Sequence, residues 1–313
     1  MIIIVSVVAG LLILALAVTY ICFHLTFYSK TRRPLGEDEY DIPDGEVYQQ
    51  FRPQIITWTK EKRALPHQDV SITSFDGLTL RGQYFECDPK APMEIMFPGY
   101  RGNAERDLAG GVHRAFALGR NVLLVDQRAA GYSDGHIISF GINEHKDCLK
   151  WVGFAISHFG KDVKIILTGI SMGASTVLLA SGYDLPENVI GILADCGYTS
   201  AKDIIKKVIR QIKLPPALLY PIIRFGGMMF GGFDIESVSP IEQVKKCKIP
   251  VIFVHGETDD FVPFSMSQAM YNACTSKKKL IAVPNAGHGL AYPVAQESYI
   301  EALRDFEKEC AQA

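Results

Sequence analysis

Residues 169–173 read Gly-Ile-Ser-Met-Gly, and they follow a short, mostly apolar run at 164–168 and open an apolar stretch of helical length at 172–181. A serine between two glycines, at the turn from a buried strand into a helix, is the pattern of a nucleophile elbow. The glycines are needed because side chains in so tight a turn would collide with the neighbouring strand and helix. A serine hydroxyl is a poor nucleophile by itself, so this pattern requires a histidine base and an orienting acid. We therefore predict Ser171 as the nucleophile.

Candidate partners of this serine follow it in the chain order serine, acid, histidine, which is the order expected after such an elbow. Only two of the eight histidines, His255 and His288, come after the serine. His255 precedes the acidic residues at the end of a predicted strand, so we predict His288 as the base. The acid is Asp259 or its neighbour Asp260, with Asp259 preferred, and Asp195 at the end of the preceding strand is a geometric rival.

Short apolar runs alternate with helical patterns from Asp69 onward, which is typical of a parallel sheet with crossover helices. Asp76-Gly77 between two apolar runs predicts a hairpin, so the sheet should begin with an antiparallel pair. The candidate strands are 70–74, 78–85, 94–97, 121–126, 164–169, 189–195, 250–255 and 280–283. Helical patterns lie at 47–62, 104–118, 143–158, 172–181, 265–274 and 294–309. We predict an α/β fold with a mostly parallel eight-stranded sheet and helices on both faces.

Residues 200–248 separate two predicted strands by far more than one crossover helix needs. Ile204, Val208 and Ile212 recur at helical spacing among lysines and arginines, and a dense apolar stretch follows at 218–230. We predict a small helical lid inserted over the sheet edge. Two compatible readings stay open, namely an amphipathic cap packed on the body, or a lid that forms an acyl pocket or touches a membrane.

The first residues differ in kind from the rest, because residues 2–23 form a run of 22 residues without a charge. Such a run spans roughly 30 Å of hydrocarbon. A cleaved signal peptide is the alternative, since residues 15–17 (Ala-Leu-Ala) resemble a cleavage site, but no basic region precedes the run and it stays apolar beyond that point. We predict an uncleaved transmembrane anchor at 1–27, a tether and lead-in helix at 28–68, and one α/β domain at 69–313.

Three basic residues, Lys30, Arg32 and Arg33, follow the apolar run. The positive-inside rule then predicts a cytoplasmic location for the domain, attached to the membrane through the N-terminal helix.

The overall composition excludes one class of partner. A net charge of −2 over 313 residues, without a basic stripe, argues against nucleic-acid binding. The seven cysteines are scattered singly, with no CxxC pair and no metal-ligand spacing with histidines. We expect mostly buried thiols, no metal and no cofactor. The oligomeric state stays open.

Six ordered motifs make the chain from about Asp69 onward resemble the α/β-hydrolase superfamily, and in detail the BEM46-type serine hydrolases and their bacterial membrane-anchored relatives. They lie at 98–103 (Pro-Gly-Tyr-Arg-Gly-Asn), 126–135, 169–173, 195–200, 255–263 (His-Gly-Glu-Thr-Asp-Asp-Phe-Val-Pro) and 287–288 (Gly-His). In that family the aspartate at the position of Asp259 is the triad acid. The chain departs from the family at Pro98, where a histidine is frequent, and at Ala129, where a glycine is frequent.

The resemblance gives the glycine-rich loop at 97–103 a role in its main chain. Attack on an ester or thioester carbonyl creates an oxyanion, which this fold stabilises with the N–H after the nucleophile, here Met172, and with an N–H from the loop after the third strand. By resemblance the second donor is Tyr100. Arg101 is predicted to tie loops together, and Asp126 and Arg128 likewise.

We therefore expect a serine hydrolase that cleaves carboxylic ester or thioester bonds in a small-molecule or lipid-like substrate. One alternative is a peptidase or amidase of the prolyl-oligopeptidase type, although those enzymes commonly carry a further glycine where Ala174 stands, and no propeller domain precedes the catalytic one. A second alternative is a catalytically silent, membrane-tethered binding module, whose expected sign would be a lost triad residue.

Overall fold

The computed structural model describes residues 2–30, 36, 38–43 and 45–311. Its centre is an eight-stranded sheet with the order β1-β2-β4-β3-β5-β6-β7-β8. The strands are β1 (Gln68–Thr73), β2 (Thr79–Phe85), β3 (Met93–Phe97), β4 (Asn121–Val125), β5 (Ile165–Ile170), β6 (Val189–Asp195), β7 (Val251–Gly256) and β8 (Lys278–Val283). β2 pairs antiparallel with β1 and β4, and the other neighbours are parallel. The predicted α/β fold with a mostly parallel eight-stranded sheet is confirmed.

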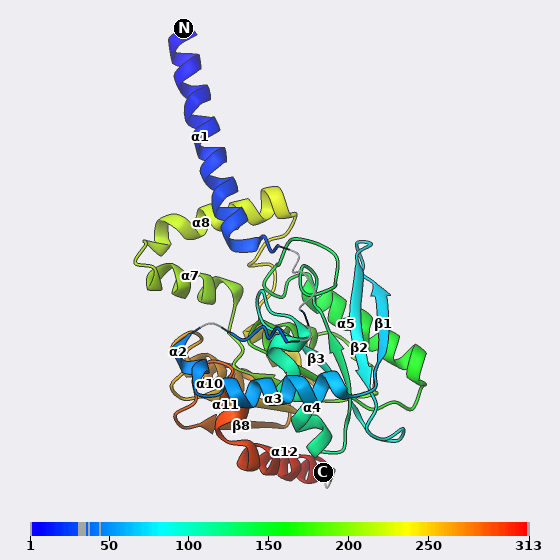
Figure 1. Ribbon diagram of the computed structural model, residues 1–313. Coiled ribbons are helices and arrows are strands. Elements are labelled where there is room, and N and C mark those ends of the chain that lie inside the picture. Colours follow the sequence, from blue (N-terminus) through cyan, green and yellow to red (C-terminus); the bar gives the residue numbers. More distant parts are fainter. Residues whose placement is uncertain (1, 31–35, 37, 44, 312–313) are drawn as a thin grey trace.

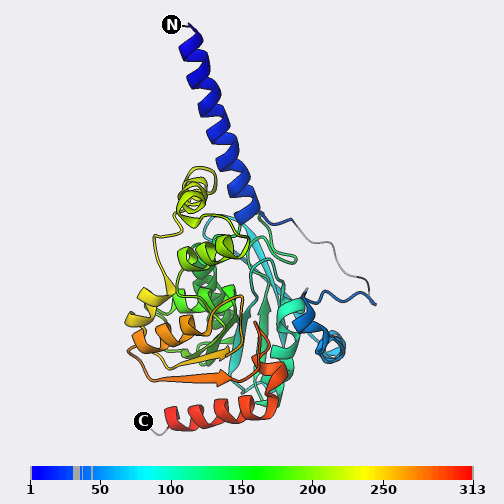
Figure 2. The same ribbon diagram turned by 90° about the vertical axis from the view of Figure 1, so that its left-hand side faces the viewer.

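Helices cover both faces of this sheet, which is why its central strands are continuously apolar. The helices are α1 (Ile2–Phe27), α2 (Glu46–Gln49), α3 (Arg52–Ala64), α4 (Ala104–Ala117), α5 (Glu144–Phe159), α6 (Met172–Ala180), α7 (Ala201–Gln211), α8 (Pro216–Gly226), η1 (Gly227–Gly231), α9 (Pro240–Gln243), η2 (Val244–Lys246), α10 (Phe264–Ala273), α11 (Ala291–Val294) and α12 (Gln296–Ala311). α5, α6 and α10 pack on one face, and α3, α4 and α12 lie on the other (Figures 1 and 2). Every residue of β3 and β4 is buried between these layers.

The lead-in helix differs from the single helix expected at 47–62. It is divided into α2 and α3, with Gln50 and Phe51 between them. Pro53 lies in the first turn of α3, where a proline is tolerated because the N–H it lacks would have no helical partner. The same ring would clash with a continuous helix, so a new helix starts there. Residues 31–35, 37 and 44 of the predicted tether lie outside the described residues.

The N-terminal helix α1 projects away from the body (Figure 1) and is long and apolar enough to cross a membrane. Its last turns nevertheless belong to the body, because Thr19, Phe23 and Phe27 are buried. Phe27 is fully enclosed, and its carbonyl accepts a hydrogen bond of 2.8 Å from the N–H of Ile138. The end of α1 is therefore packed like a core helix.

The predicted insertion at 200–248 contains α7, α8, η1, α9 and η2. α7 packs against the body through Ile204, Ile205 and Ile209. The expectation that Ile212 shares this apolar face is wrong, since its side chain is 60 % exposed. α7 ends at Gln211, so Ile212 has already left the helical repeat.

Candidate active site

Ser171 lies between the end of β5 and the start of α6, in a backbone conformation that is rare for a residue with a side chain. Its φ is 55° and its ψ is −116°. The flanking glycines explain how the turn closes. A Cβ on Gly169 would come within 2.2 Å of the backbone of Gly173, and one on Gly173 would come within 2.0 Å of the carbonyl oxygen of Phe97. Side chains at positions 169 and 173 would therefore collide with the neighbouring backbone, as the sequence pattern predicts.

The loops that follow β7 and β8 bring an acid and an imidazole to this serine. His288 Nε2 lies 2.9 Å from Ser171 Oγ, and His288 Nδ1 lies 2.7 Å from Asp259 Oδ2. With the ring hydrogen on Nδ1, the imidazole donates to the carboxylate and its Nε2 accepts from the serine hydroxyl. These contacts form a continuous chain from hydroxyl to base to acid, which is the geometry of a nucleophile activated by a general base.

The Asp259 side chain is fully buried, yet four donors surround it. Its Oδ1 accepts from the N–H groups of Phe261 (2.9 Å) and Val262 (2.8 Å), and its Oδ2 faces His288 and the Nε2 of His255 (3.1 Å). Burial raises the pKa of Asp259, but the hydrogen bonds from His255, His288 and Val262 outweigh burial and hold this pKa below its usual range. The carboxylate is therefore kept ionised.

His255 is one of two residues whose part in this site the sequence did not reveal. It is fully buried, its Nε2 also lies 2.8 Å from the carbonyl oxygen of Val262, and its Nδ1 lies 2.7 Å from Ser267 Oγ. A ring with its hydrogen on Nε2 satisfies both contacts, because Nδ1 then accepts from the Ser267 hydroxyl. His255 thus contacts the acid loop through Asp259 and Val262, while His288 faces Ser171.

The two rival acids lie elsewhere. The side chain of Asp260 is exposed, and its backbone carbonyl accepts from Lys207 and Gln211. Asp195 is buried and accepts a hydrogen bond of 3.2 Å from the Tyr299 hydroxyl. Within the described part of the chain, neither carboxylate bonds His288.

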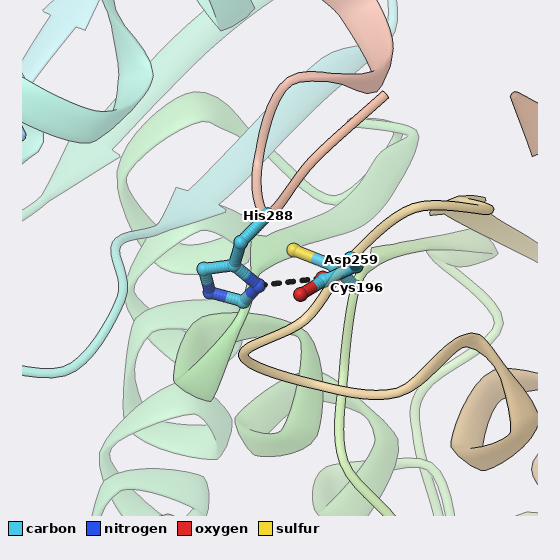
Figure 3. Close-up of side chains that lie close together, drawn as sticks. All are labelled: Cys196, Asp259 and His288. Carbon is cyan, nitrogen blue, oxygen red and sulfur yellow. Dashed lines mark hydrogen bonds and ion pairs between the residues drawn. The ribbon is translucent and has the colours of Figure 1, made fainter. Parts of the chain in front are cut away.

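Cys196 is the third side chain of the group in Figure 3, where it lies beside the pair formed by Asp259 and His288. The potential ligand atoms of these three residues lie within 4.8 Å of one another. Burial, reinforced by Asp195 and Asp259, raises the pKa of the Cys196 thiol well above its usual value. The other two side chains already bond each other, and His288 Nε2 bonds Ser171 Oγ, so this donor set does not favour a metal.

The loop at 97–103 lies against the nucleophile, since a Cβ on Gly99 would be 3.5 Å from Ser171 Cβ. Side chains from two directions fix this loop. Gly99 N–H donates to Asp107 Oδ2 at 2.8 Å, and Gln127 Nε2 donates to the Pro98 carbonyl at 2.7 Å. Neither the N–H of Tyr100 nor that of Met172 finds a hydrogen-bond partner among the described residues. Both expected oxyanion donors thus lack a hydrogen-bond acceptor among the described residues.

A cavity of about 220 Å³ opens beside Ser171 and His288. Its lining is mainly apolar and includes Trp58 from α3 and the two glycines of α4. Two residues of this lining, Arg114 and Asp195, each have a buried polar atom (Nε and Oδ1) with no hydrogen-bond partner among the described residues. The cavity therefore combines apolar walls with a small polar region.

The lead-in segment also reaches the site, which no pattern in the sequence indicated. Tyr48 in α2 donates its hydroxyl hydrogen to the backbone carbonyl of His288 at 2.9 Å. Tyr48 lies about 240 residues before His288 in the chain, so no local sequence pattern indicates this contact.

The three residues predicted to tie loops together do so. Arg101 donates to the carbonyls of Leu25 and Tyr28 at the end of α1, both at 2.8 Å. Asp126 accepts from the N–H groups of Ala104 and Tyr132, both at 2.9 Å. Arg128 forms ion pairs with Asp147 and Asp76.

Comparisons with known proteins agree with this fold. Residues 95–225 match the family described as alpha/beta hydrolase fold, and residues 226–313 match the prolyl oligopeptidase family. The esterase Pf2001 of Pyrococcus furiosus has a similar structure, with a TM-score of 0.66 and 20 % identity over 90 % of this chain and 98 % of that one. The chain belongs to the α/β-hydrolase superfamily.

Curated relatives narrow the class further. The Bacillus subtilis protein YqkD is 30 % identical over 196 residues, which span 62 % of this chain and 64 % of that protein. Protein bem46 of Schizosaccharomyces pombe is 24 % identical over 256 residues, or 79 % of each chain. The protein is a BEM46-like α/β hydrolase.

Proposed function

We propose that this hydrolase cleaves carboxylic ester or thioester bonds through an acyl-enzyme on Ser171. The supporting observation is the unbroken chain of contacts from Ser171 Oγ to His288 Nε2 at 2.9 Å and from His288 Nδ1 to Asp259 Oδ2 at 2.7 Å. In this proposal His288 is the general base, Asp259 orients it, and the N–H groups of Tyr100 and Met172 stabilise the oxyanion.

The first half of the reaction forms the acyl-enzyme. His288 Nε2 takes the hydroxyl proton as Ser171 Oγ attacks the carbonyl carbon, and the carbonyl electrons move onto the oxygen. The buried carboxylate of Asp259 stabilises the imidazolium that results. When the oxyanion collapses, the bond to the alcohol or thiol breaks and the leaving group receives the proton from His288.

The second half releases the acid. Water takes the place of the leaving group, His288 removes one of its protons, and the hydroxide attacks the acyl carbon. Collapse of this second oxyanion breaks the bond to Ser171 Oγ, which takes the proton back from His288. The N–H donors serve both steps and are expected to contribute about 3 kcal/mol each.

Ser171→Ala tests the proposal directly. The variant should lose hydrolysis of short p-nitrophenyl esters and labelling by a fluorophosphonate probe, because both require the serine oxygen. Ser298→Ala is the matched control, since Ser298 is exposed and its hydroxyl, among the described residues, donates only to the nearby Ala295 carbonyl. Labelling retained by Ser171→Ala would exclude Ser171 as the nucleophile.

A second candidate function is amide or peptide hydrolysis, because residues 226–313 match the prolyl oligopeptidase family. The same triad serves both reactions, so only the substrate distinguishes them. A panel of matched ester and amide substrates with the same acyl group decides between the two. Faster turnover of the amide would favour the peptidase reading.

We also propose that α1 is an uncleaved membrane anchor with the domain on the cytoplasmic side. The helix is 26 residues long and contains an 18-residue stretch with mean hydropathy 3.0, and the basic residues Lys30, Arg32 and Arg33 follow it. Mass spectrometry of the intact purified protein tests the first part, since cleavage after Ala17 would remove most of α1. Protease protection in sealed membranes tests the second.

A further inference from the structure

The segment α8–η1 exposes a row of large apolar side chains. Phe225 and Met229 are each 50 % exposed, Met228 is 44 % exposed and Phe230 is 38 % exposed. Leu218, in the first turn of α8, is 63 % exposed. We call these five side chains the α8–η1 face. Exposed apolar side chains that gather in this way mark a surface with a partner.

The α8–η1 face is continuous with α1. A Cβ on Gly226 would lie 3.0 Å from the Cβ of Phe23 and 3.2 Å from the carbonyl oxygen of Thr19, so the two backbones approach closely. The ring of Phe230 meets that of Tyr20 edge to face, with centroids 5.3 Å apart. Both views show α8 lying across the base of α1, on the side of the body from which that helix rises (Figures 1 and 2).

The length of α1 determines where its contact with α8 and η1 would lie relative to a membrane that α1 spans. The exposed part of the helix, residues 2–18, rises about 25 Å, and the hydrocarbon layer of a bilayer is about 30 Å thick. If α1 spans that layer, the hydrocarbon ends within about one or two turns of Thr19 and Phe23, where α8 and η1 pack. The α8–η1 face then lies at the membrane boundary rather than in water.

The charges around the face suit such a position. Arg210 and Lys213 are exposed at the end of α7, next to the start of α8. The acidic residues near the face are paired with cations, because Asp234 and Glu236 pair with Arg224 at 2.7 and 3.1 Å, and Glu236 also pairs with Lys202 at 3.3 Å. Basic side chains at the level of the headgroups favour contact with anionic lipids.

We propose that the α8–η1 face inserts into the bilayer beside α1, so that the lipid surface is its partner and the body is held with this side against the membrane. The proposal rests on the anchor role of α1 and does not depend on the reaction catalysed at Ser171. A second copy of the chain is the alternative occupant, and the experiment below separates the two.

Depth-dependent quenching of tryptophan tests the proposal in the full chain. Met229→Trp is reconstituted in nanodiscs that hold one chain each and contain phosphatidylcholine and phosphatidylglycerol with brominated acyl chains. The unaltered chain supplies the background of Trp58 and Trp151, which are buried in the body. Phe225→Trp is a second, more conservative variant in case Met229→Trp does not fold.

Two further variants calibrate the signal. Leu12→Trp reports α1 itself. Ile190→Trp is the matched control, because Ile190 is 40 % exposed and lines a groove beside α12, on the side of the body away from α1 (Figure 1).

We expect the face variants to be quenched at least half as strongly as Leu12→Trp, and Ile190→Trp to match the background. Quenching of Leu12→Trp without quenching of the face variants would overturn this proposal alone. Absence of quenching at Leu12→Trp would overturn the anchor role as well.

Discussion

Replacing Asp259 by asparagine keeps the shape of the side chain but removes its charge beside His288. In the transition state His288 is an imidazolium, and its Nδ1 lies 2.7 Å from the carboxylate. Two unit charges about 4 Å apart at an effective dielectric constant of about 20 interact by about 4 kcal/mol, which corresponds to a factor of roughly 10³ in rate. An asparagine N–H facing Nδ1 also favours the wrong tautomer, so we expect kcat to fall by about 10³ to 10⁴.

The assay is ester hydrolysis by the purified full chain, with the kcat of Asp259→Asn measured beside that of Asp260→Asn. The adjacent residue is a matched control, because the Asp260 side chain is exposed and only its backbone carbonyl bonds the body. Asp260→Asn should therefore keep its activity within about twofold. Thermal unfolding of both variants verifies that the loop remains folded.

The reasoning fails in either of two outcomes. If Asp259→Asn keeps more than a tenth of the activity, the buried carboxylate does not support the base. If Asp260→Asn loses as much as Asp259→Asn, the acid loop as a whole matters and the particular contact with His288 does not.

Three further predictions concern the turn, the acid and the oxyanion loop. Gly173→Ala places a Cβ 2.0 Å from the Phe97 carbonyl oxygen and should destabilise the fold by about 3 kcal/mol or more. Gly153→Ala is the control: its Cβ would meet nothing within 4 Å, so it should stabilise the fold by roughly 0.5–1 kcal/mol. Equal denaturation midpoints for the two variants would contradict this prediction. Because folding lowers the pKa of Asp259, its contribution to stability is complete above the unfolded carboxyl pKa of about 3.9 and is lost as the pH falls through the lower folded pKa. The free energy of unfolding should therefore fall below about pH 4, less steeply in Asp259→Asn, and parallel pH profiles would argue against it. Tyr100→Phe removes the 2.7 Å hydrogen bond to the Thr26 carbonyl but keeps the main-chain N–H. We therefore expect a stability loss of about 1 kcal/mol and a fall in kcat/KM of less than tenfold. A fall in kcat/KM of more than a hundredfold would place the function of Tyr100 in its side chain.

The fold and the central contacts of the site could be predicted because their signals are local. Gly169 and Gly173 flank Ser171 at a strand-to-helix turn, and the clashes that a Cβ would cause there are fixed by the turn itself. The buried strands read as apolar runs because helices cover both faces of the sheet. The chain order of serine, acid and histidine then selects His288, and the resemblance to the family supports Asp259 over its rivals.

The supporting contacts could not be predicted, because they join segments that have no common pattern. Tyr48 lies in a polar segment before the sheet, yet its hydroxyl holds the backbone of His288. The position of His255 argues against it as the base, and only the folded loop reveals that it supports Asp259. Nothing in the sequence around either residue indicates these contacts.

The end of α1 shows a related limit. Phe23 and Phe27 continue the apolar composition of a membrane-crossing helix, so hydropathy cannot tell that they are buried in protein. Their packing partners in the α8–η1 segment come about 200 residues later. Composition could predict the helix, but only tertiary structure separates its exposed part from its packed part.

The packed end of α1 decides where this protein can be shortened. Tyr100 and Arg101, in the loop beside the nucleophile, donate hydrogen bonds to the carbonyls of Thr26 and Leu25. A fragment that starts after the tether would lack these two acceptors and would uncover the pocket that holds Phe27. A soluble fragment should therefore begin before Thr19 and retain the last two turns of α1 as part of the catalytic domain.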